Sequence, residues 1–255
     1  NKVSEVATTQ LSGHLGVPVK IGNVDIEWFN RLVLEGLYLE DQDGKVMFEA
    51  NHVAAGFEIM PLLEGKFVFT TVRLFGFSFN LRKHTPESPL NLQFVIDAFA
   101  SKDSIKKEKN IDLRFNSIMI RRGNFSYNVD SEKETPGKFN AKHIDIKNLS
   151  AKISLKAFNK DSVNAHIKKM SFDEASGFSL NKLSLNVVGN RDSAFVQDFE
   201  VRLPQTNLKI GRARIDLSEI DSLPALLNNA PIDLNITPSQ ICLKDLSPFV
   251  PAFKN

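Results

Sequence analysis

Apolar and polar residues alternate along most of the chain, which predicts a protein built mainly of β-strands. The clearest stretch is 60–83, whose apolar residues form two short runs, Phe67/Phe69 and Leu74/Phe77/Phe79/Leu81. Successive side chains of a strand point to opposite faces, so each run has one apolar and one polar face. We interpret 60–83 as two strands paired in a hairpin and preceded by a turn at 61–65.

The alternation continues on both sides of this stretch and slips by one residue at several points. Gly22-Asn23 interrupts the alternation within 17–28, and Gly36 separates Leu32/Leu34 from Leu37/Leu39. Such slips indicate turns or β-bulges. Residues 41–44 have a hairpin-turn sequence in which glycine supplies a positive φ. Further strands are predicted at 46–50, 53–59, 111–115, 118–120, 125–129, 139–146, 149–155, 162–168, 178–187, 195–203, 207–216 and 232–236.

Three helical patterns interrupt the strands. One apolar stripe predicts a helix within 1–16, and a second predicts a helix at about 88–100. A third, short helix is expected at 222–229. The first stripe consists of Val3, Val6, Ala7, Leu11 and Leu15, and the second of Leu92, Val95, Ile96 and Phe99.

The number of strands limits the possible architectures. Neighbouring strands lie about 4.8 Å apart, so a single sheet of about 14 to 17 strands would be roughly 70–80 Å wide. Strongly twisted sheets of more than about ten strands usually curl, split into two layers or close. Alternation alone therefore leaves three architectures open: a sandwich, a closed barrel, or a long sheet curled into a trough.

Composition narrows the classes of function. The chain has 20 Phe against 2 Tyr and 1 Trp, so its aromatic residues offer apolar area with few polar groups. The net charge of +2 is too small to indicate a nucleic-acid partner, and none is expected. The single cysteine, Cys242, excludes a disulfide within the chain.

The sequence lacks the motifs of common catalytic and metal sites. Its five histidines are scattered without metal-ligand spacing, and it has neither a glycine-rich phosphate loop nor a nucleophile elbow. We therefore predict no enzymatic activity, no metal and no cofactor. Two polar features stand out: Asp97, interpreted as solvation of a helix end, and Arg121-Arg122, interpreted as a charge pair at the end of a strand.

The order of these features resembles the start of AsmA-like proteins, and more narrowly of the TamB-type translocation and assembly proteins of bacteria with two membranes. The resemblance spans nearly the whole chain and is densest in residues 14–130. It is carried by Val-Pro-Val-Lys-Ile-Gly-Asn-Val-Asp-Ile at 17–26, the alternating run at 32–41, Pro-Leu-Leu-Glu-Gly-Lys at 61–66, Ser-Pro-Leu-Asn-Leu-Gln-Phe at 88–94 and Ile-Arg-Arg-Gly-Asn-Phe-Ser-Tyr at 120–127.

The resemblance implies a long, curled antiparallel β-sheet with an apolar groove, similar to the bridge-like, chorein-type lipid carriers. It divides the chain into an N-terminal helix at 1–16, a β-region at 17–101 with a capping helix at about 88–100, and a continued groove region at 111–255. It also implies a periplasmic location, an inner-membrane anchor upstream of residue 1, and an outer-membrane barrel partner contacted beyond residue 255.

The function implied by the resemblance is non-catalytic transport of phospholipid between the inner and outer membranes. Each acyl CH₂ group exposed to water costs about 0.8 kcal/mol, so such a route needs a continuous apolar lining. The candidate lining residues are Ile21, Ile26, Phe48, Phe57, Phe67, Phe69, Leu74, Phe77, Phe79, Phe115, Ile120 and Phe125.

Two other functions are compatible with a β-rich chain. The first is a scaffold or chaperone for outer-membrane proteins, which would offer strand edges to its clients. The second is a secreted protein that binds or hydrolyses glycans, and the scarcity of Tyr and Trp argues against it.

Overall fold

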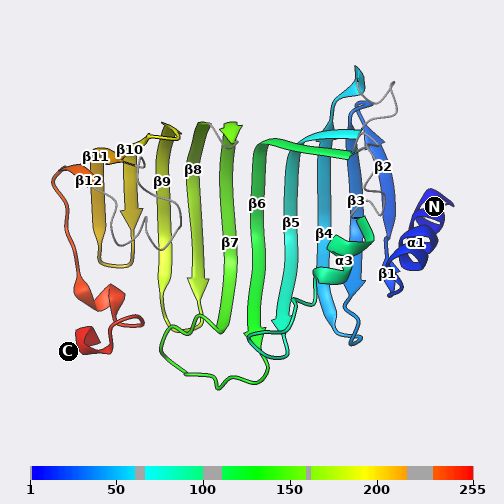
Figure 1. Cartoon of the computed structure of the whole chain (residues 1–255), viewed down its shortest axis with the longest axis horizontal. Helices are drawn as coiled ribbons and strands as arrows, with labels where there is room; N and C mark the ends of the chain where they lie inside the picture. The colour runs from blue at the N-terminus through cyan, green and yellow to red at the C-terminus, as the bar shows by residue number, and fades with distance from the viewer. Residues whose placement is uncertain (1, 61–66, 100–110, 159–161, 217–231, 255) are drawn as a thin grey trace.

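A computed structural model describes residues 2–60, 67–99, 111–158, 162–216 and 232–254 (Figure 1). The described strands form one twelve-stranded sheet that is not closed into a barrel. The prediction of a mainly β protein with an N-terminal helix is therefore confirmed. The elements are α1 (Lys2–Leu15), β1 (Val19–Lys20), β2 (Asn23–Glu27), β3 (Arg31–Glu40), β4 (Val46–Phe57), β5 (Phe67–Lys83), α3 (Gln93–Phe99), β6 (Ile111–Val129), β7 (His143–Phe158), β8 (Ser162–Glu174), β9 (Ser179–Asn190), β10 (Ser193–Arg202), β11 (Asn207–Asp216), β12 (Ile232–Ile236) and the 3₁₀ helices η1 (Leu243–Leu246) and η2 (Pro251–Lys254).

Strand order follows the chain from β3 to β12, with β1 and β2 both paired to β3. All pairs are antiparallel except β5 and β6, which are parallel. The prediction of an antiparallel sheet is wrong at this pair. Residues 84–110 separate the two strands and include α3, so the chain returns to the starting end of β5 before β6 begins, as a parallel pair requires.

Several pairs of predicted strands are single long strands. The hairpin expected within 60–83 is one strand, β5, which contains both apolar runs; the turn expected at 61–65 lies outside the described residues. The runs predicted at 111–115, 118–120 and 125–129 are likewise one strand, β6. The described part of the chain therefore has fewer and longer strands than the alternation predicted.

The slips in the alternation lie at left-handed residues and bulges inside these strands. Gly76 in β5 has a φ of +58° and lies opposite Arg122 in β6, whose φ is +50°. Gly36 in β3, Asn148 in β7 and Asp198 in β10 also have positive φ. A bulge redirects the side chains that follow it without ending the strand, which explains why one strand can carry two runs of opposite phase.

The bulges keep apolar residues on one side of the sheet. Leu149 and Ala151 of β7 are two residues apart and therefore point to the same side. Their partners in β6, Gly123 and Ile120, are three residues apart, so β6 contains one extra residue between them. That extra residue compensates for the slip in the sequence, and both partners stay on the side of Leu149 and Ala151.

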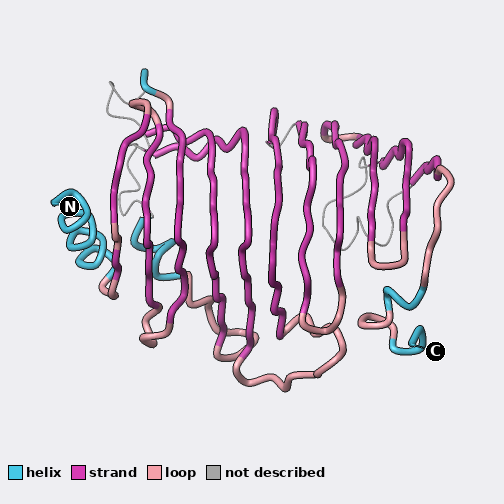
Figure 2. The backbone as a smooth tube through the Cα atoms, turned by 180° about the vertical axis from the view of Figure 1, so that it is seen from behind, coloured by secondary structure: helices cyan, strands magenta, loops and turns pink. Residues whose placement is uncertain are grey.

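The helices lie at the ends of the sheet. The helix α1 stands beside the N-terminal edge, α3 lies over β3 and β4, and η1 and η2 lie below the lower ends of the C-terminal strands (Figures 1 and 2). The helix α3 is shorter than the predicted 88–100, and the helix expected at 222–229 lies outside the described residues. Among the described residues, no helix has the length and apolar character that a bilayer crossing needs.

The side of α1 that faces the sheet is polar. The backbone N–H of Ile21 donates to Thr8 Oγ1 (3.2 Å), and Val19 exchanges hydrogen bonds with the Ser12 hydroxyl (3.0 and 3.2 Å). Val3 and Val6, two members of the predicted apolar stripe, are 57% and 61% exposed. The helix therefore satisfies backbone groups of the edge strand and does not bury this part of its apolar stripe against the sheet.

Candidate functional site

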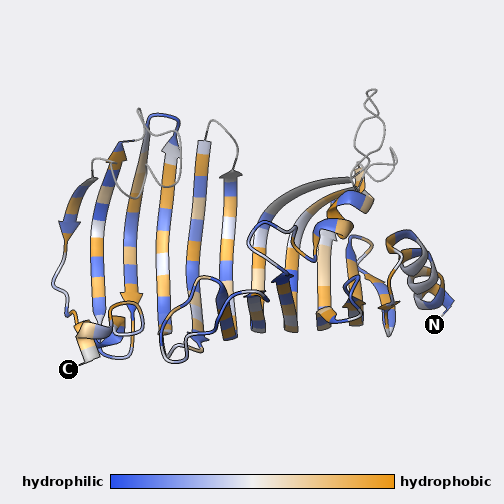
Figure 3. Cartoon of the chain, turned by 60° about the horizontal axis from the view of Figure 1, so that its bottom comes forward, coloured by the Kyte–Doolittle hydropathy of each residue, from blue (hydrophilic) through white to orange (hydrophobic). Residues whose placement is uncertain are grey.

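Apolar residues form continuous rows that run across the sheet from strand to strand. Residues directly opposite each other on neighbouring strands lie on the same face, so the register identifies each row. The first row runs from β2 to β11 and consists of Val24, Leu34, Val53, Leu74, Ile120, Ala151, Met170, Leu183, Val201 and Leu208. Apolar and polar bands follow one another along the strands in Figure 3.

A second row lies beside the first on the same face, two residues away along each strand except β8, where the bulge between Ile167 and Met170 makes the offset three. It runs from β2 to β9 and consists of Ile26, Leu32, Ala55, Val72, Ile118, Ile153, Ile167 and Leu185. On the other side of the bulges, a third row runs from β1 to β7 and consists of Val19, Leu39, Phe48, Phe79, Phe125 and Ile146. We call the surface formed by these three rows the apolar face and the opposite side of the sheet the polar face.

The phenylalanines of the third row pack against one another and against Phe77. The ring of Phe48 lies 6.2 Å from that of Phe77 and 5.7 Å from that of Phe79, centroid to centroid, and Phe79 lies 6.2 Å from Phe125. Phe77 is buried, whereas the other three rings are half-buried. These four residues come from β4, β5 and β6 and form one cluster, as a shared lining would require.

The structure places the other predicted lining residues at different points. Leu74 and Ile120 lie opposite each other in the first row, and Ile26 begins the second row, 59% exposed. Phe57 packs edge-on against Phe69 at 6.4 Å, at one end of β4 and β5. Ile21 is buried in the short connection between β1 and β2. Phe67 and Phe115 lie in β5 and β6, but their side chains are outside the described part of the structure.

Much of the apolar face extends beyond the predicted residues. The rows continue through Met170, Leu183 and Val201 on β8, β9 and β10, which the sequence analysis did not select. Nearly all members of the first two rows are only partly buried, and no described helix or strand forms a second layer over β5–β10 (Figures 1 and 2). A sheet normally buries its apolar face against another layer, so this open face is a candidate binding surface.

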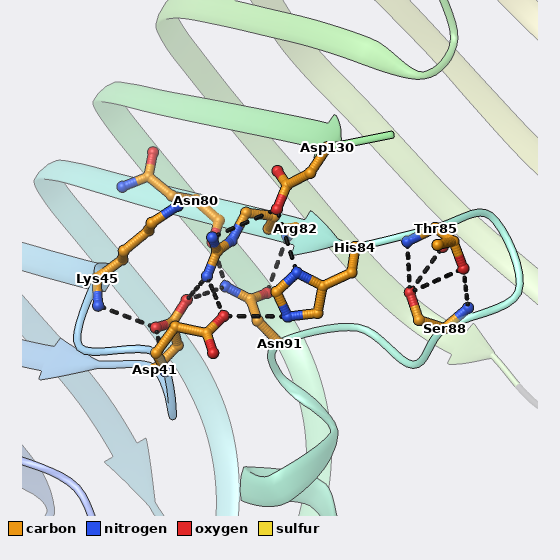
Figure 4. A network of polar contacts seen from close by, with 10 residues as sticks. Asp41, Lys45, Asn80, Arg82, His84, Thr85, Ser88, Asn91 and Asp130 are labelled. Carbon is orange, nitrogen blue, oxygen red and sulfur yellow. Dashed lines mark hydrogen bonds and ion pairs between the residues drawn. The ribbon is translucent and has the colours of Figure 1, made fainter. Parts of the chain in front are cut away.

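A buried carboxylate on the N-terminal half of the sheet holds three segments of the chain together (Figure 4). Asp41 is 2% exposed, and its Oδ1 accepts the backbone N–H groups of Asp43 and Lys45, both at 3.0 Å. Its Oδ2 accepts hydrogen bonds from Arg82 Nη2 and Asn91 Nδ2, also at 3.0 Å. Burial alone would raise the pKa of Asp41. The hydrogen bonds, that of Asn91 first, outweigh burial and hold the pKa below its usual value of 3.8.

Arg82 and His84 extend this network toward β6. Arg82, with a side chain 12% exposed, also contacts the carboxylates of Asp43 and Asp130. His84 lies between the same two carboxylates, with Nε2 3.2 Å from Asp43 and Nδ1 3.3 Å from Asp130. Arg82 thus contacts three carboxylates, so the network links the turn after β3 to β5 and to the end of β6.

The described residues contain no cluster of His, Cys, Asp or Glu suited to holding a metal ion. Comparisons with protein-family models, with curated proteins and with solved structures found no match for this chain.

Proposed function

We propose that the chain is a non-catalytic lipid carrier of the cell envelope, whose apolar face holds phospholipid acyl chains as they pass between the inner and outer membranes. The observation that carries this proposal is the continuity of the first row, which crosses from β2 to β11 without a polar residue. Acyl chains offer no hydrogen-bond partners, so an uninterrupted apolar path is the surface that suits them.

The proposal includes the curled shape and the cellular setting that the resemblance implies. A sheet curled around the apolar face would shield the acyl chains from water on one side, while the polar face would remain solvated. The periplasmic location, an inner-membrane anchor and an outer-membrane barrel partner belong to the same proposal. They rest on the sequence resemblance alone.

The decisive test places a charge on the apolar face. Ile118 belongs to the second row, whereas its neighbour Ser117 points to the polar face. We expect Ile118→Glu to abolish transfer of a fluorescent phospholipid between liposomes, because the carboxylate would have to lose its water against the acyl chains. Ser117→Glu, the matched control, should transfer lipid like the unmodified chain.

A second measurement keeps the test independent of folding. Phospholipid carrying a photoreactive acyl chain should crosslink to the three apolar rows of the unmodified protein, as located by mass spectrometry. Crosslinks spread evenly over both faces, or no lipid bound at all, would refute a lipid carrier. Circular dichroism and the urea midpoint of both glutamate variants would show whether either substitution unfolds the sheet.

A scaffold for outer-membrane proteins is the second candidate. It is favoured by β12, which ends the strand order and has Leu234 and Ile236 49% and 57% exposed. Within the described chain no strand covers its outer edge, so a client strand could pair there. In that case charges on the edge of β12 would abolish client binding, and Ile118→Glu would leave it intact.

A further inference from the structure

A cluster of positive charge lies on the polar face, near the middle of the sheet. It surrounds a pocket of about 670 Å³ whose described lining includes Phe75, Met119 and Ser150 but no carboxylate. Arg121 follows Ile120 of the first row, and Lys152 follows Ala151, so both side chains point away from the apolar face. We define the basic cluster as the cations of this lining: Arg121, Arg122, Lys152, Lys168 and Lys169.

Two bulges concentrate these cations. Between Ile120 and Gly123, β6 has one more residue than β7, and the two residues in that interval are Arg121 and Arg122. Between Ile167 and Met170, β8 likewise has one more residue than β9, and the interval contains Lys168 and Lys169. A bulge places an additional side chain at one point of a sheet. In both bulges that side chain is a cation.

Repulsion within the basic cluster destabilises the folded sheet. Lys152 of β7 and Lys169 of β8 lie directly opposite each other, and like charges in that position destabilise a sheet. Of the ion pairs between described residues, none includes a member of the basic cluster. Arg122 adds backbone strain, because its Cβ atom crowds the backbone at a φ of +50°. A bound anion would offset this repulsion.

One guanidinium of the cluster is already oriented. The Arg122 guanidinium lies 4.3 Å above the centre of the Phe75 ring. The backbone N–H of Arg122 donates a hydrogen bond to Ser150 Oγ at 3.4 Å. Stacking on a ring fixes the plane of a guanidinium while leaving its N–H groups free to bind an anion in its own plane. The neighbouring Lys152 and Lys169 supply additional charge at the same place.

We propose that the basic cluster is a binding site for a phosphoryl group. Phosphoryl oxygens carry up to two negative charges and match the bidentate geometry of arginine, which suits a site with cations only. A pocket of this size accommodates a pyrophosphate or the phosphorylated head of a larger molecule. The cations of this site point away from the proposed acyl-chain surface, and the site does not depend on the proposed function.

The test measures binding of two probes to the whole 255-residue chain. Inorganic pyrophosphate is titrated by calorimetry, and vesicles of phosphatidic acid in phosphatidylcholine are tested by co-sedimentation. We expect Arg122→Ser to weaken binding about tenfold, because each charge-assisted hydrogen bond contributes substantially to affinity. Binding of pyrophosphate would show that the basic cluster binds a free phosphoryl compound. Binding of the vesicles alone would show that it binds the head group of a lipid.

Arg212→Ser is the matched control, because the Arg212 guanidinium also lies over a phenylalanine, 4.8 Å from the Phe195 ring centre, outside the pocket. It should leave the affinity unchanged. Lys169→Ser should raise the melting temperature in anion-free buffer, by relieving repulsion with Lys152, and at the same time weaken binding. No binding of either probe, or equal weakening by Arg122→Ser and Arg212→Ser, would overturn the site.

Discussion

At the scale of single residues, Asp41 contributes most to holding distant segments together. Its two carboxylate oxygens accept four hydrogen bonds, from the turn after β3, from Arg82 of β5 and from Asn91 before α3. A buried carboxylate is tolerated only when its oxygens are satisfied in this way. The sequence marked residues 41–44 as a turn but gave no indication of the buried ion pair with Arg82.

Replacing Asp41 by asparagine should therefore cost about 3 kcal/mol of unfolding free energy, because Arg82 would lose its most buried partner. The exposed neighbour Asp43, which also contacts Arg82, is the control; Asp43→Asn should cost less than about 1 kcal/mol. Urea denaturation at pH 7 measures both values. Equal losses in the two variants would contradict the central role of Asp41.

The unmodified chain and the Asp41→Asn variant should also differ in how their stability depends on pH. The pKa of Asp41 is lowered in the folded state, so its ionised form is the one that folding stabilises. That stabilisation is complete above the usual pKa of 3.8 and disappears as pH falls through the lower, folded-state pKa. The stability difference between the unmodified chain and Asp41→Asn should thus be constant near neutral pH and shrink below pH 3.8.

At the scale of elements, the bulges of β6 depend on a small residue beside them. A Cβ atom added to Gly123 would lie 2.2 Å from Cε1 and 2.4 Å from Cζ of Phe77. Phe77 is 6% exposed and packs against Phe48, so its ring has little room to move. Gly123 is therefore the position at which the aromatic cluster meets the backbone of β6.

We expect Gly123→Ala to destabilise the fold by about 1–3 kcal/mol, the usual cost of overpacking. Gly211→Ala provides the comparison, because the nearest heavy atom to its added Cβ is Thr237 Cγ2 at 3.5 Å, an ordinary contact. That variant should be neutral or slightly stabilising, since alanine restricts the unfolded chain. Chemical denaturation measures the unfolding free energy of both variants. An unchanged unfolding free energy for Gly123→Ala would mean that the Phe77 ring moves aside without cost.

At the scale of the whole molecule, the two edges of the sheet differ. The N-terminal edge is covered by α1, whose Thr8 and Ser12 hydroxyls bond the backbone of Ile21 and Val19. The other end of the strand order is β12, which no described strand follows. Uncovered edges pair with other chains, so α1 restricts growth of the sheet to one direction.

Thr8→Val combined with Ser12→Ala should release the N-terminal edge and promote self-association. The hydroxyls would no longer bond the edge backbone, which would then be available to a second molecule. Sedimentation velocity should show dimers or larger species at concentrations where the unmodified chain does not form them. Thr9→Val with Gln10→Ala, on the exposed side of α1, is the control and should leave the sedimentation profile unchanged.

Part of the candidate site could be predicted from local patterns. Phe48, Phe77, Phe79 and Phe125 were selected by alternation and aromatic character, and the structure brings them into one cluster. Met170 on β8 was not among the predicted lining residues, although part of its strand was predicted. Alternation alone does not show which side of a strand joins a row. Arg121-Arg122, interpreted as a strand-end pair, lies within β6 at a bulge.

The sequence by itself determined that the chain is a β protein with an N-terminal helix and a turn in which Gly44 has a positive φ, because a period of two and a glycine in a turn sequence are local properties. Only the tertiary structure decided that β5 is one strand, that β5 and β6 are parallel, and that Lys152 faces Lys169. Each of these depends on which partner a strand pairs with and in what register. Pairing joins residues far apart in the chain, so no local pattern contains it.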